Sequence, residues 1–414
     1  MVKAYGSTST GSTQKTSTQN TDVNSELGAL VLDNGASSDK ALNDDAKAEV
    51  KDEVAAEAVS AEFEEDPDNA NYVARIGQTG YLTLQNAIDS AVDGNTISLL
   101  KDIAFASSEG LIVNKDITIN LGGKSITGAH DPLVVIGSGV LKYNPTAAQL
   151  THSGHLTIKG EGSITSSNWD MFCIFPDASL DVYSGTFTGF KAAFYVYGGT
   201  LNTYGGNFTA TSPNNTYIVQ VKNAGSANIY AGNFTTPASG GYGVYLDNAS
   251  ESNFGSENGE GPTFNTWRAC IASNGSESHS VLANIYSGTY NSYRSDNSPD
   301  EQSVIQLANA TSETQTLNIY GGTFEQIGSH AERSIFNVRY DGTININVNG
   351  GTFTPSAANR LFNGVGSDQS GWPTTDNVHL TVSNGAIPAG TQNVIVYNTS
   401  GAHVTAKDIE LVVE

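Results

Sequence analysis

The stretch LNIYGGTFEQ, residues 317–326, recurs along this chain in closely similar forms. Each form begins with alternating residues and continues with a glycine, then Thr or Asn, then an aromatic ring. The other copies are LDVYSGTFTG (180–189), LNTYGGNFTA (201–210), ANIYAGNFTT (227–236), ANIYSGTYNS (283–292) and INVNGGTFTP (346–355). Repeats at intervals of roughly 20 to 50 residues are typical of solenoids, propellers and repeat arrays.

Within LNIYGGTFEQ, strand alternation places Leu317 and Ile319 on one side and Asn318 and Tyr320 on the other. Phe324 resumes the apolar side after the turn. Glycine at the turn accepts backbone angles that other residues resist. The sequence therefore predicts a corner in every copy, with its glycine at Gly185, Gly206, Gly232, Gly288, Gly322 and Gly351, and a weaker copy, GEGPTF (259–264), in the widest gap.

A second strand precedes most of these corners. We align DMFCIFPD (170–177), KAAFYVYG (191–198), TYIVQVKN (216–223), GYGVYLDN (241–248), RACIASNG (268–275), QSVIQLAN (302–309) and RSIFNVRY (333–340). In this register Phe194/Val196, Val219/Val221, Val244/Leu246, Ile305/Leu307 and Phe336/Val338 point inward. A slip of one residue would exchange the two sides of a strand.

Each repeat unit is therefore one coil of three strands. We expect successive coils to stack so that each strand pairs with its equivalent about 4.8 Å away. One coil cannot bury its apolar side alone, whereas a stack shares a continuous core. The prediction is an all-β protein, a parallel β-helix. A propeller or an immunoglobulin sandwich remains the alternative, although neither explains such close repetition.

The segment YLTLQNAIDSAVDGNTISLLKDI, residues 81–103, predicts a short capping helix that leads into strands. Leu84, Ala87, Ile88 and Ala91 have helical spacing, and Asp93–Gly94 ends the helix. Residues 1–71 contain a Ser/Thr-rich tract and an acidic segment with few apolar residues, and we expect a disordered spacer there. The β-helix domain is predicted over residues 72–414, with its N-terminal cap at about 72–110.

The chain has 414 residues and a formal charge of −23, from 19 Lys and Arg against 42 Asp and Glu. Such acidity repels a nucleic-acid backbone and an anionic membrane, so neither is an expected partner. No apolar run is long enough to insert in a membrane. The start lacks the apolar segment of a signal peptide and the end lacks a wall-sorting motif, so a wall-anchored parent protein would be longer than this chain.

The cap segment followed by coils with GGTF or GGNF resembles the right-handed parallel β-helix of the pectate-lyase-like superfamily. It is similar in particular to repeat-bearing surface proteins of gut and other Gram-positive bacteria. The resemblance covers about residues 72–414. It implies an extracellular or cell-surface location, and it leaves activity open, because that superfamily includes lyases, glycoside hydrolases, tailspikes and adhesins.

An enzyme of this superfamily would be expected to show more of a catalytic motif set than this sequence does. Asn-x-Asp occurs at 114–116 and 168–170, with no Asp-Asp or Gly-His-Gly in the predicted β-helix. His152 and His155 lack ligands at metal-site spacing and are expected in a surface loop. No metal or cofactor is predicted. Cys173 and Cys270 lie about four coils, roughly 19 Å, apart, too far for a disulfide. We expect free thiols, Cys173 inward and Cys270 outward.

The outward side of the second strands is the predicted ligand face. One column reads Ile174, Tyr195, Gln220, Tyr245, Ala272, Gln306, Asn337, and the next reads Pro176, Tyr197, Lys222, Asp247, Asn274, Ala308, Arg339. Flat aromatic rings and amides suit hydroxyl-rich ligands. The expected ligand-binding residues are Tyr195, Tyr197, Gln220, Tyr245, Gln306 and Asn337. A plain solvated strand face is the alternative.

A further row of tyrosines precedes the corners at Tyr183, Tyr204, Tyr230, Tyr286 and Tyr320. Such a row favours a self-stacking ladder, with a sugar-binding strip as the alternative. The expected function is a monomeric, adhesin-like module that binds a glycan or a host surface ligand. The alternatives are a polysaccharide lyase or glycoside hydrolase, with Lys222 or Arg339 as base and Asp247 as acid or metal ligand, and a purely structural solenoid.

Overall fold

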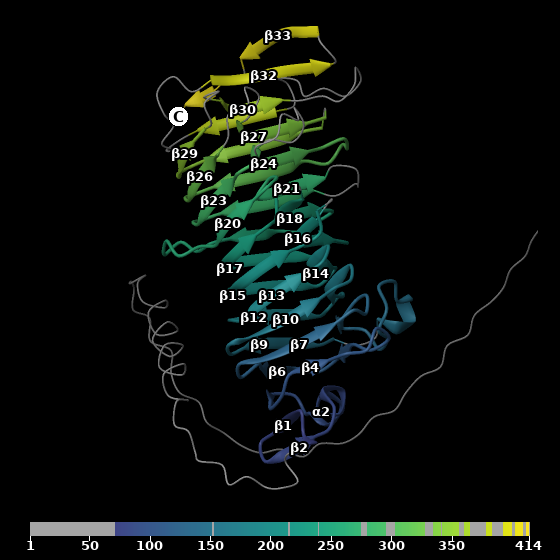
Figure 1. The fold of residues 1–414 in the computed structure, drawn as a ribbon. Coiled ribbons are helices and arrows are strands. Elements are labelled where there is room, and N and C mark those ends of the chain that lie inside the picture. The colour runs from purple at the N-terminus through teal and green to yellow at the C-terminus, as the bar shows by residue number, and fades with distance from the viewer. Residues whose placement is uncertain are drawn as a thin grey trace, which may run out of the picture. The chain divides into compact units, whose positions relative to one another are not determined.

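The computed structural model describes residues 71–150, 153–213, 216–238, 240–274, 280–294, 303–327, 334–340, 342–355, 360–364, 378–382, 392–399, 402–408 and 411–413, all within one compact unit. These residues form a column of stacked coils (Figure 1). The strands of the coils fall into three sets, which we call face 1, face 2 and face 3. The predicted spacer, residues 1–71, lies outside the described residues except for residue 71.

Face 1 holds the strand that leads into each corner. Its strands are β1 (Ala74–Ile76), β3 (Asn95–Leu99), β6 (Ile117–Asn120), β9 (His155–Lys159), β12 (Ser179–Val182), the first parts of β15 (Thr200–Ala210) and β17 (Ser226–Thr235), β19 (Ser252–Phe254), β22 (Val281–Ile285), β25 (Gln315–Ile319), β28 (Ile344–Val348), β31 (Val378–Val382) and β34 (Leu411–Val413).

Face 2 follows the corner. It contains β4 (Ile103–Ala104), β7 (Lys124–Gly128), β10 (Gly162–Ser166), β13 (Thr186–Gly189), the later parts of β15 and β17, β20 (Thr263–Thr266), β23 (Thr289–Ser292), β26 (Thr323–Gln326) and β29 (Thr352–Thr354).

Face 3 contains the strands that the sequence aligned as second strands, together with further strands before and after them. It contains β5 (Leu111–Val113), β8 (Val134–Ile136), β11 (Asp170–Ile174), β14 (Ala192–Tyr197), β16 (Thr216–Lys222), β18 (Gly241–Asp247), β21 (Ile271–Asn274), β24 (Ser303–Ala308), β27 (Ser334–Arg339), β30 (Arg360–Gly364), β32 (Gln392–Thr399) and β33 (Ala402–Asp408).

Pairing between coils is parallel, as predicted, and joins equivalent residues of neighbouring repeats. Leu317, for example, lies opposite Ala283 on one side and Ile346 on the other. Antiparallel pairing occurs among the described strands only at the two ends: β1 with β3, β1 with β2 (Thr79–Tyr81), and β32 with β33. The prediction of an all-β fold with long parallel sheets is confirmed, and these sheets are compatible with a β-solenoid.

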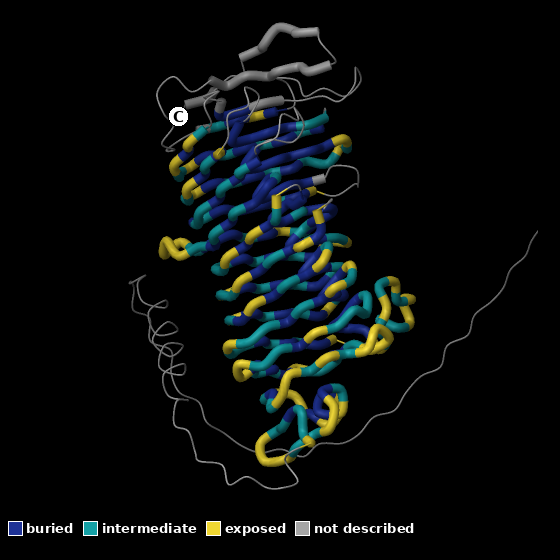
Figure 2. The backbone as a smooth tube through the Cα atoms, viewed as in Figure 1, coloured by how far each residue is buried: buried dark blue, intermediate teal, exposed yellow. Residues whose placement is uncertain are grey.

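A continuous stack of aromatic rings fills the interior behind face 2. One ring comes from each coil, and neighbouring ring centroids lie 4.6 to 5.4 Å apart. The stack runs through Phe187, Phe208, Phe234, Phe264, Tyr290, Phe324 and Phe353, all fully buried. The interior of the column is thus a dry apolar core, and the exposed residues gather at the corners and loops (Figure 2).

The predicted corner glycines all adopt the left-handed backbone region. Their φ angles lie between +97° and +123°, at Gly185, Gly206, Gly232, Gly288, Gly322 and Gly351. A Cβ is disfavoured there, because L residues rarely adopt these angles. In the weaker copy Pro262 precedes β20 at the equivalent position, after a short excursion of the chain through residues 256–261.

The N-terminal cap also matches the sequence. Helix α2 (Leu84–Ser90) begins at Thr83, whose hydroxyl accepts the Asn86 N–H, and Lys115 Nζ donates to the carbonyls of Asp89 and Ala91 at its end. The Gln85 amide bonds both the N–H and the C=O of Ile112 on β5. It thereby covers the free edge of face 3, which would otherwise invite pairing with another chain.

No helix in the described part of the chain has the length and apolar character that crossing a membrane requires.

The alternation assumed for face 3 fails at the start of each strand. Two consecutive residues there enter the core, such as Met171 with Phe172 and Cys270 with Ile271. In β11 the true partners are Cys173 with Tyr195 and Ile174 with Val196, one residue from the predicted register. Both cysteine orientations were therefore predicted wrongly: Cys173 faces outward beneath a loop, and Cys270 faces inward. Both thiols are free, as predicted.

We predict that Gly322→Ala lowers the free energy of unfolding by about 1–3 kcal/mol, because alanine must adopt the strained angle of φ +104°. Thr323→Ala, at the exposed neighbouring position, is the matched control and should change it by less than about 0.5 kcal/mol. Urea unfolding followed by circular dichroism measures both. Equal stability of the two variants would contradict the role assigned to the corner.

Candidate functional site

The outer side of face 3 carries the predicted ligand residues in register. Pairing follows the predicted column from Tyr195 to Gln220, Tyr245, Ala272, Gln306 and Asn337. In the next column Tyr197 lies opposite Lys222. Only the first members, Ile174 and Pro176, were placed wrongly, because of the one-residue slip in β11. The predicted register of this column therefore holds over six coils.

Burial divides this surface into three parts: a buried start, a half-buried middle and a buried far end. Tyr195, Gln306 and Asn337 are almost fully buried, with 4, 4 and 1 % of their surface exposed. The middle part is half-buried and open to solvent, and we call it the window: Tyr197, Tyr217, Gln220, Lys222 and Tyr245. Of the six predicted ligand residues, the structure therefore presents Tyr197, Gln220 and Tyr245 together at the surface.

The tyrosines of the window rest on a rigid aromatic base. The Tyr217 ring lies 4.6 Å from Tyr245 and 5.7 Å from the buried Tyr242. The Arg268 guanidinium sits 5.3 Å over the Tyr242 ring and donates from Nη1 to its hydroxyl at 3.1 Å. Tyr217, Tyr242 and Arg268 were not predicted as site residues. The tyrosines stand at the second place of aligned segments, where strict alternation gave no reason to select them.

Of the three residues assigned to catalysis in the enzyme alternative, the structure brings two together. Lys222 Nζ and Asp247 Oδ2 form an ion pair of 2.7 Å at the edge of the window. An ammonium held by a carboxylate is a poor proton acceptor. Arg339 stands on β27, four coils from Lys222, which corresponds to about 19 Å at the coil spacing.

The buried amides at the far end of face 3 lack partners for their carbonyl oxygens. Gln306 Oε1 and Asn337 Oδ1 are enclosed and accept no hydrogen bond from the described residues, although the two side chains belong to directly paired positions. The asparagine side chains stacked on face 1 behave differently. On face 1 an asparagine ladder donates from each Nδ2 to the preceding Oδ1 at 2.9 to 3.0 Å, through Asn347, Asn318, Asn284, Asn253, Asn228 and Asn202.

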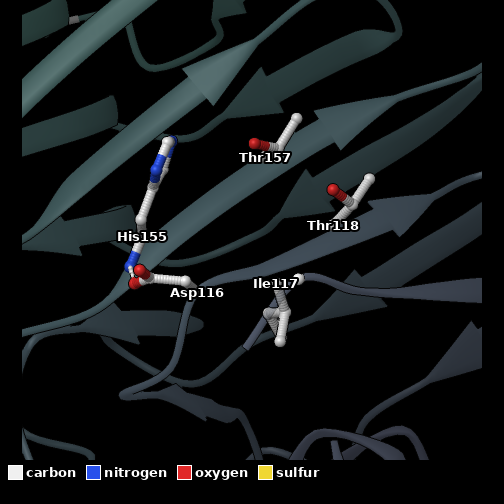
Figure 3. A pocket seen from close by; sticks show the side chains of 6 residues that line it. Asp116, Ile117, Thr118, His155 and Thr157 are labelled. Atoms are coloured by element: carbon white, nitrogen blue, oxygen red, sulfur yellow. Dashed lines mark hydrogen bonds between the residues drawn. The ribbon is translucent and has the colours of Figure 1, made fainter. Parts of the chain in front are cut away.

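The asparagine ladder ends near His155, which lines a shallow depression together with Asp116, Thr118 and Thr157 (Figure 3). Asn202 donates to Asp181 Oδ1 at 2.7 Å, and Asp181 Oδ2 lies 3.1 Å from His155 Nε2 without hydrogen-bond geometry. His155 begins strand β9, whereas the sequence predicted a loop; His152 lies outside the described residues. Within the described ranges no three His, Cys, Asp or Glu side chains are placed to hold a metal.

The predicted tyrosine ladder exists as two stacks. Tyr183, Tyr204 and Tyr230 stack at 4.7 and 5.3 Å, and Tyr286 and Tyr320 stack at 5.1 Å. Gly255 interrupts the row, because it takes the position equivalent to Tyr230 in one neighbouring coil and to Tyr286 in the other. Because the faces of these rings stack on one another, mainly the ring edges are available to a sugar.

A pair of carboxyl groups lies at the corner that leads into face 3, two coils from Tyr217 of the window. Asp131 Oδ1 accepts the Asp170 N–H at 3.2 Å, and Asp170 is 4 % exposed. Burial, together with the Asp131 carboxylate, raises the pKa of Asp170 to about 7, and Lys191 opposes the shift. Trp169 beside it is half exposed, with Lys191 Nζ 3.8 Å from its ring centre. The sequence pointed to Asp170 only through the Asn-x-Asp match.

No protein-family model matches this chain, and neither the curated proteins nor the solved structures contain a match. Function is therefore inferred from the arrangement of its side chains.

We predict that the free energy of unfolding falls as the pH rises from about 4 to about 7, by up to about 1.4 kcal/mol per pH unit. The sign follows because the folded chain holds the Asp170 proton more tightly than the unfolded chain, so raising the pH disfavours folding. Asp170→Asn should remove this slope. Urea unfolding at pH 5, 6, 7 and 8 measures it, with Glu257→Gln, at an exposed position, as the control. An unchanged slope in Asp170→Asn would contradict the assignment.

Proposed function

We propose that this protein is a bacterial cell-surface or secreted binding module that recognises glycans through the window on face 3. The observation that carries the proposal is the grouping of three half-buried tyrosines with Gln220 and the Lys222–Asp247 pair on three neighbouring coils. Aromatic faces pack on the apolar faces of sugar rings, while an amide and an ion pair exchange hydrogen bonds with hydroxyl groups.

The resemblance to the right-handed β-helices of the pectate-lyase-like superfamily supports the same proposal. Column-like solenoids of that kind present one flat strand face to a polysaccharide. The formal charge of −23 favours a neutral glycan over an anionic one, since the only ammonium in the window is already paired with a carboxylate.

A carbohydrate-active enzyme is the second candidate, and one observation favours it. Asp170 and Asp131 form a carboxyl pair in which one pKa is raised to about 7, beside the exposed ring of Trp169. Pairs of carboxyl groups with separated pKa values are what general acid catalysis of glycoside cleavage requires. Product release distinguishes this candidate from a binding module, and a protein that neither binds nor cleaves glycans would be a structural solenoid.

The experiment applies the purified chain to an array of plant, microbial and mucin glycans and reads retention and released sugars in parallel. We predict retention without product. Tyr217→Ala with Tyr245→Ala should weaken retention about fivefold or more, since each lost aromatic contact costs about 0.5–1.5 kcal/mol.

Tyr183→Ala with Tyr204→Ala is the matched control, because it removes two exposed tyrosines from the face 1 ladder. The control should retain glycans as the unaltered chain does. Loss of retention in the ladder variant but not in the window variant would contradict the proposal. Released sugar that disappears in Asp170→Asn would favour the enzyme.

A further inference from the structure

The loop between β8 and β9 is held together by its own hydrogen bonds. Gly139 N–H donates to Gln149 C=O at 3.1 Å, and the short 3₁₀ helix Ala147–Gln149 is fixed by the Gln149 side chain on Thr146 N–H. We call residues 138–150 the lid; Figure 1 shows it as the blue loop that stands out from the column. Compact loops with close ends often move as units and are frequently functional.

The lid rests on face 3 almost entirely through apolar contacts. Its residues Leu141, Tyr143 and Leu150 pack against outward-facing side chains that are at most 4 % exposed, which are Val135, Cys173, Phe175 and Tyr195. Within the described chain, the one polar link from the lid to face 3 is a side-chain hydrogen bond between the phenols of Tyr143 and Tyr195. Separating the lid from the column therefore breaks few hydrogen bonds.

The lid covers an aromatic surface that continues the window. Tyr195 lies opposite Gln220 of the window, and its ring is 5.9 Å from that of Tyr197. The Tyr143 ring stacks on Tyr195 with centroids 4.8 Å apart and ring planes at 30°. A flat ring that bears a hydroxyl group therefore already occupies the place where the ring of a ligand would lie.

Glycines flank the lid where it leaves the column. Gly137 has φ +84° and donates its N–H to Val113 C=O on β5, which anchors the column side of the junction. Gly139 follows within the lid, and Gly154 precedes β9 on the return. Backbone changes at glycine are inexpensive, so these positions suit a hinge.

We propose that residues 138–150 open as a lid and uncover a second ring-binding subsite on Tyr195, next to the window, in which Tyr143 takes the place of a sugar ring when the lid is closed. The ligand class rests on the proposed function. The opening of the lid does not depend on it.

Two thiols make the opening measurable without a ligand. Cys173 lies under the lid, whereas Cys270 lies inside the core of the column. Burial raises the pKa of both thiols, that of Cys270 to about 12, so each reacts only when it is uncovered. Cys173 therefore reports lid opening and Cys270 reports opening of the column itself.

The experiment labels Cys173→Ser and Cys270→Ser chains with a disulfide reagent at pH 8 without denaturant. We expect Cys173 to react at least tenfold faster than Cys270, with little acceleration by low urea concentrations. Tyr143→Ala should raise the Cys173 rate about tenfold and leave Cys270 unchanged; Tyr204→Ala, on face 1, should change neither. Equal labelling rates for the two thiols, or equal acceleration of both by Tyr143→Ala, would overturn the proposal that residues 138–150 open as a lid.

The ligand arm repeats the labelling with a glycan that the array retains. Retention should increase several-fold in Tyr143→Ala, and the bound glycan should slow its Cys173 labelling. Fast Cys173 labelling without any retained glycan overturns the subsite and the proposed function while the lid stands. Retention with equal thiol rates overturns the lid while the proposed function stands.

Discussion

The architecture depends on one constraint: every coil must turn the same corner in register with the coils beside it. At six corners a glycine adopts a left-handed angle, and two residues later an aromatic ring enters the core. Because each ring stacks on the ring of the next coil at about the spacing of paired strands, the corner and the stack enforce one another. The sequence repeats because every coil must meet this requirement.

The same register turns chemically similar positions into rows on the outside. On face 1 the amides bond to one another. Each asparagine of the ladder donates a hydrogen bond to the asparagine of the preceding coil, and the first one donates to Asp181. Its donor ends all point toward this carboxylate, which places a negative charge where the aligned amides are positive. In the tyrosine ladder the rings likewise stack on one another. Face 3 differs, because the window residues stay partly exposed and vary from coil to coil.

Sequence reasoning recovered the features that follow from period and alternation. The corner glycines, the capping helix and the face 3 columns from Tyr195 onward all follow from spacing. It failed in β11, where the alignment was one residue out: Phe172, and not Cys173, is the equivalent of Phe194. It also missed the contact between Tyr143 and Tyr195, because no local pattern specifies where a loop packs on a distant strand. The burial of Asp170 beside Asp131 was hidden for the same reason.

The claim that face 3 is the functional surface is tested most directly by hydrogen exchange of the full chain with and without a glycan that it retains. The account predicts slower exchange in β14, β16 and β18 and faster exchange at the displaced lid, with faces 1 and 2 unchanged. Slower exchange centred on the tyrosine ladder before the corners, or no change at face 3 in the presence of a bound glycan, would contradict it.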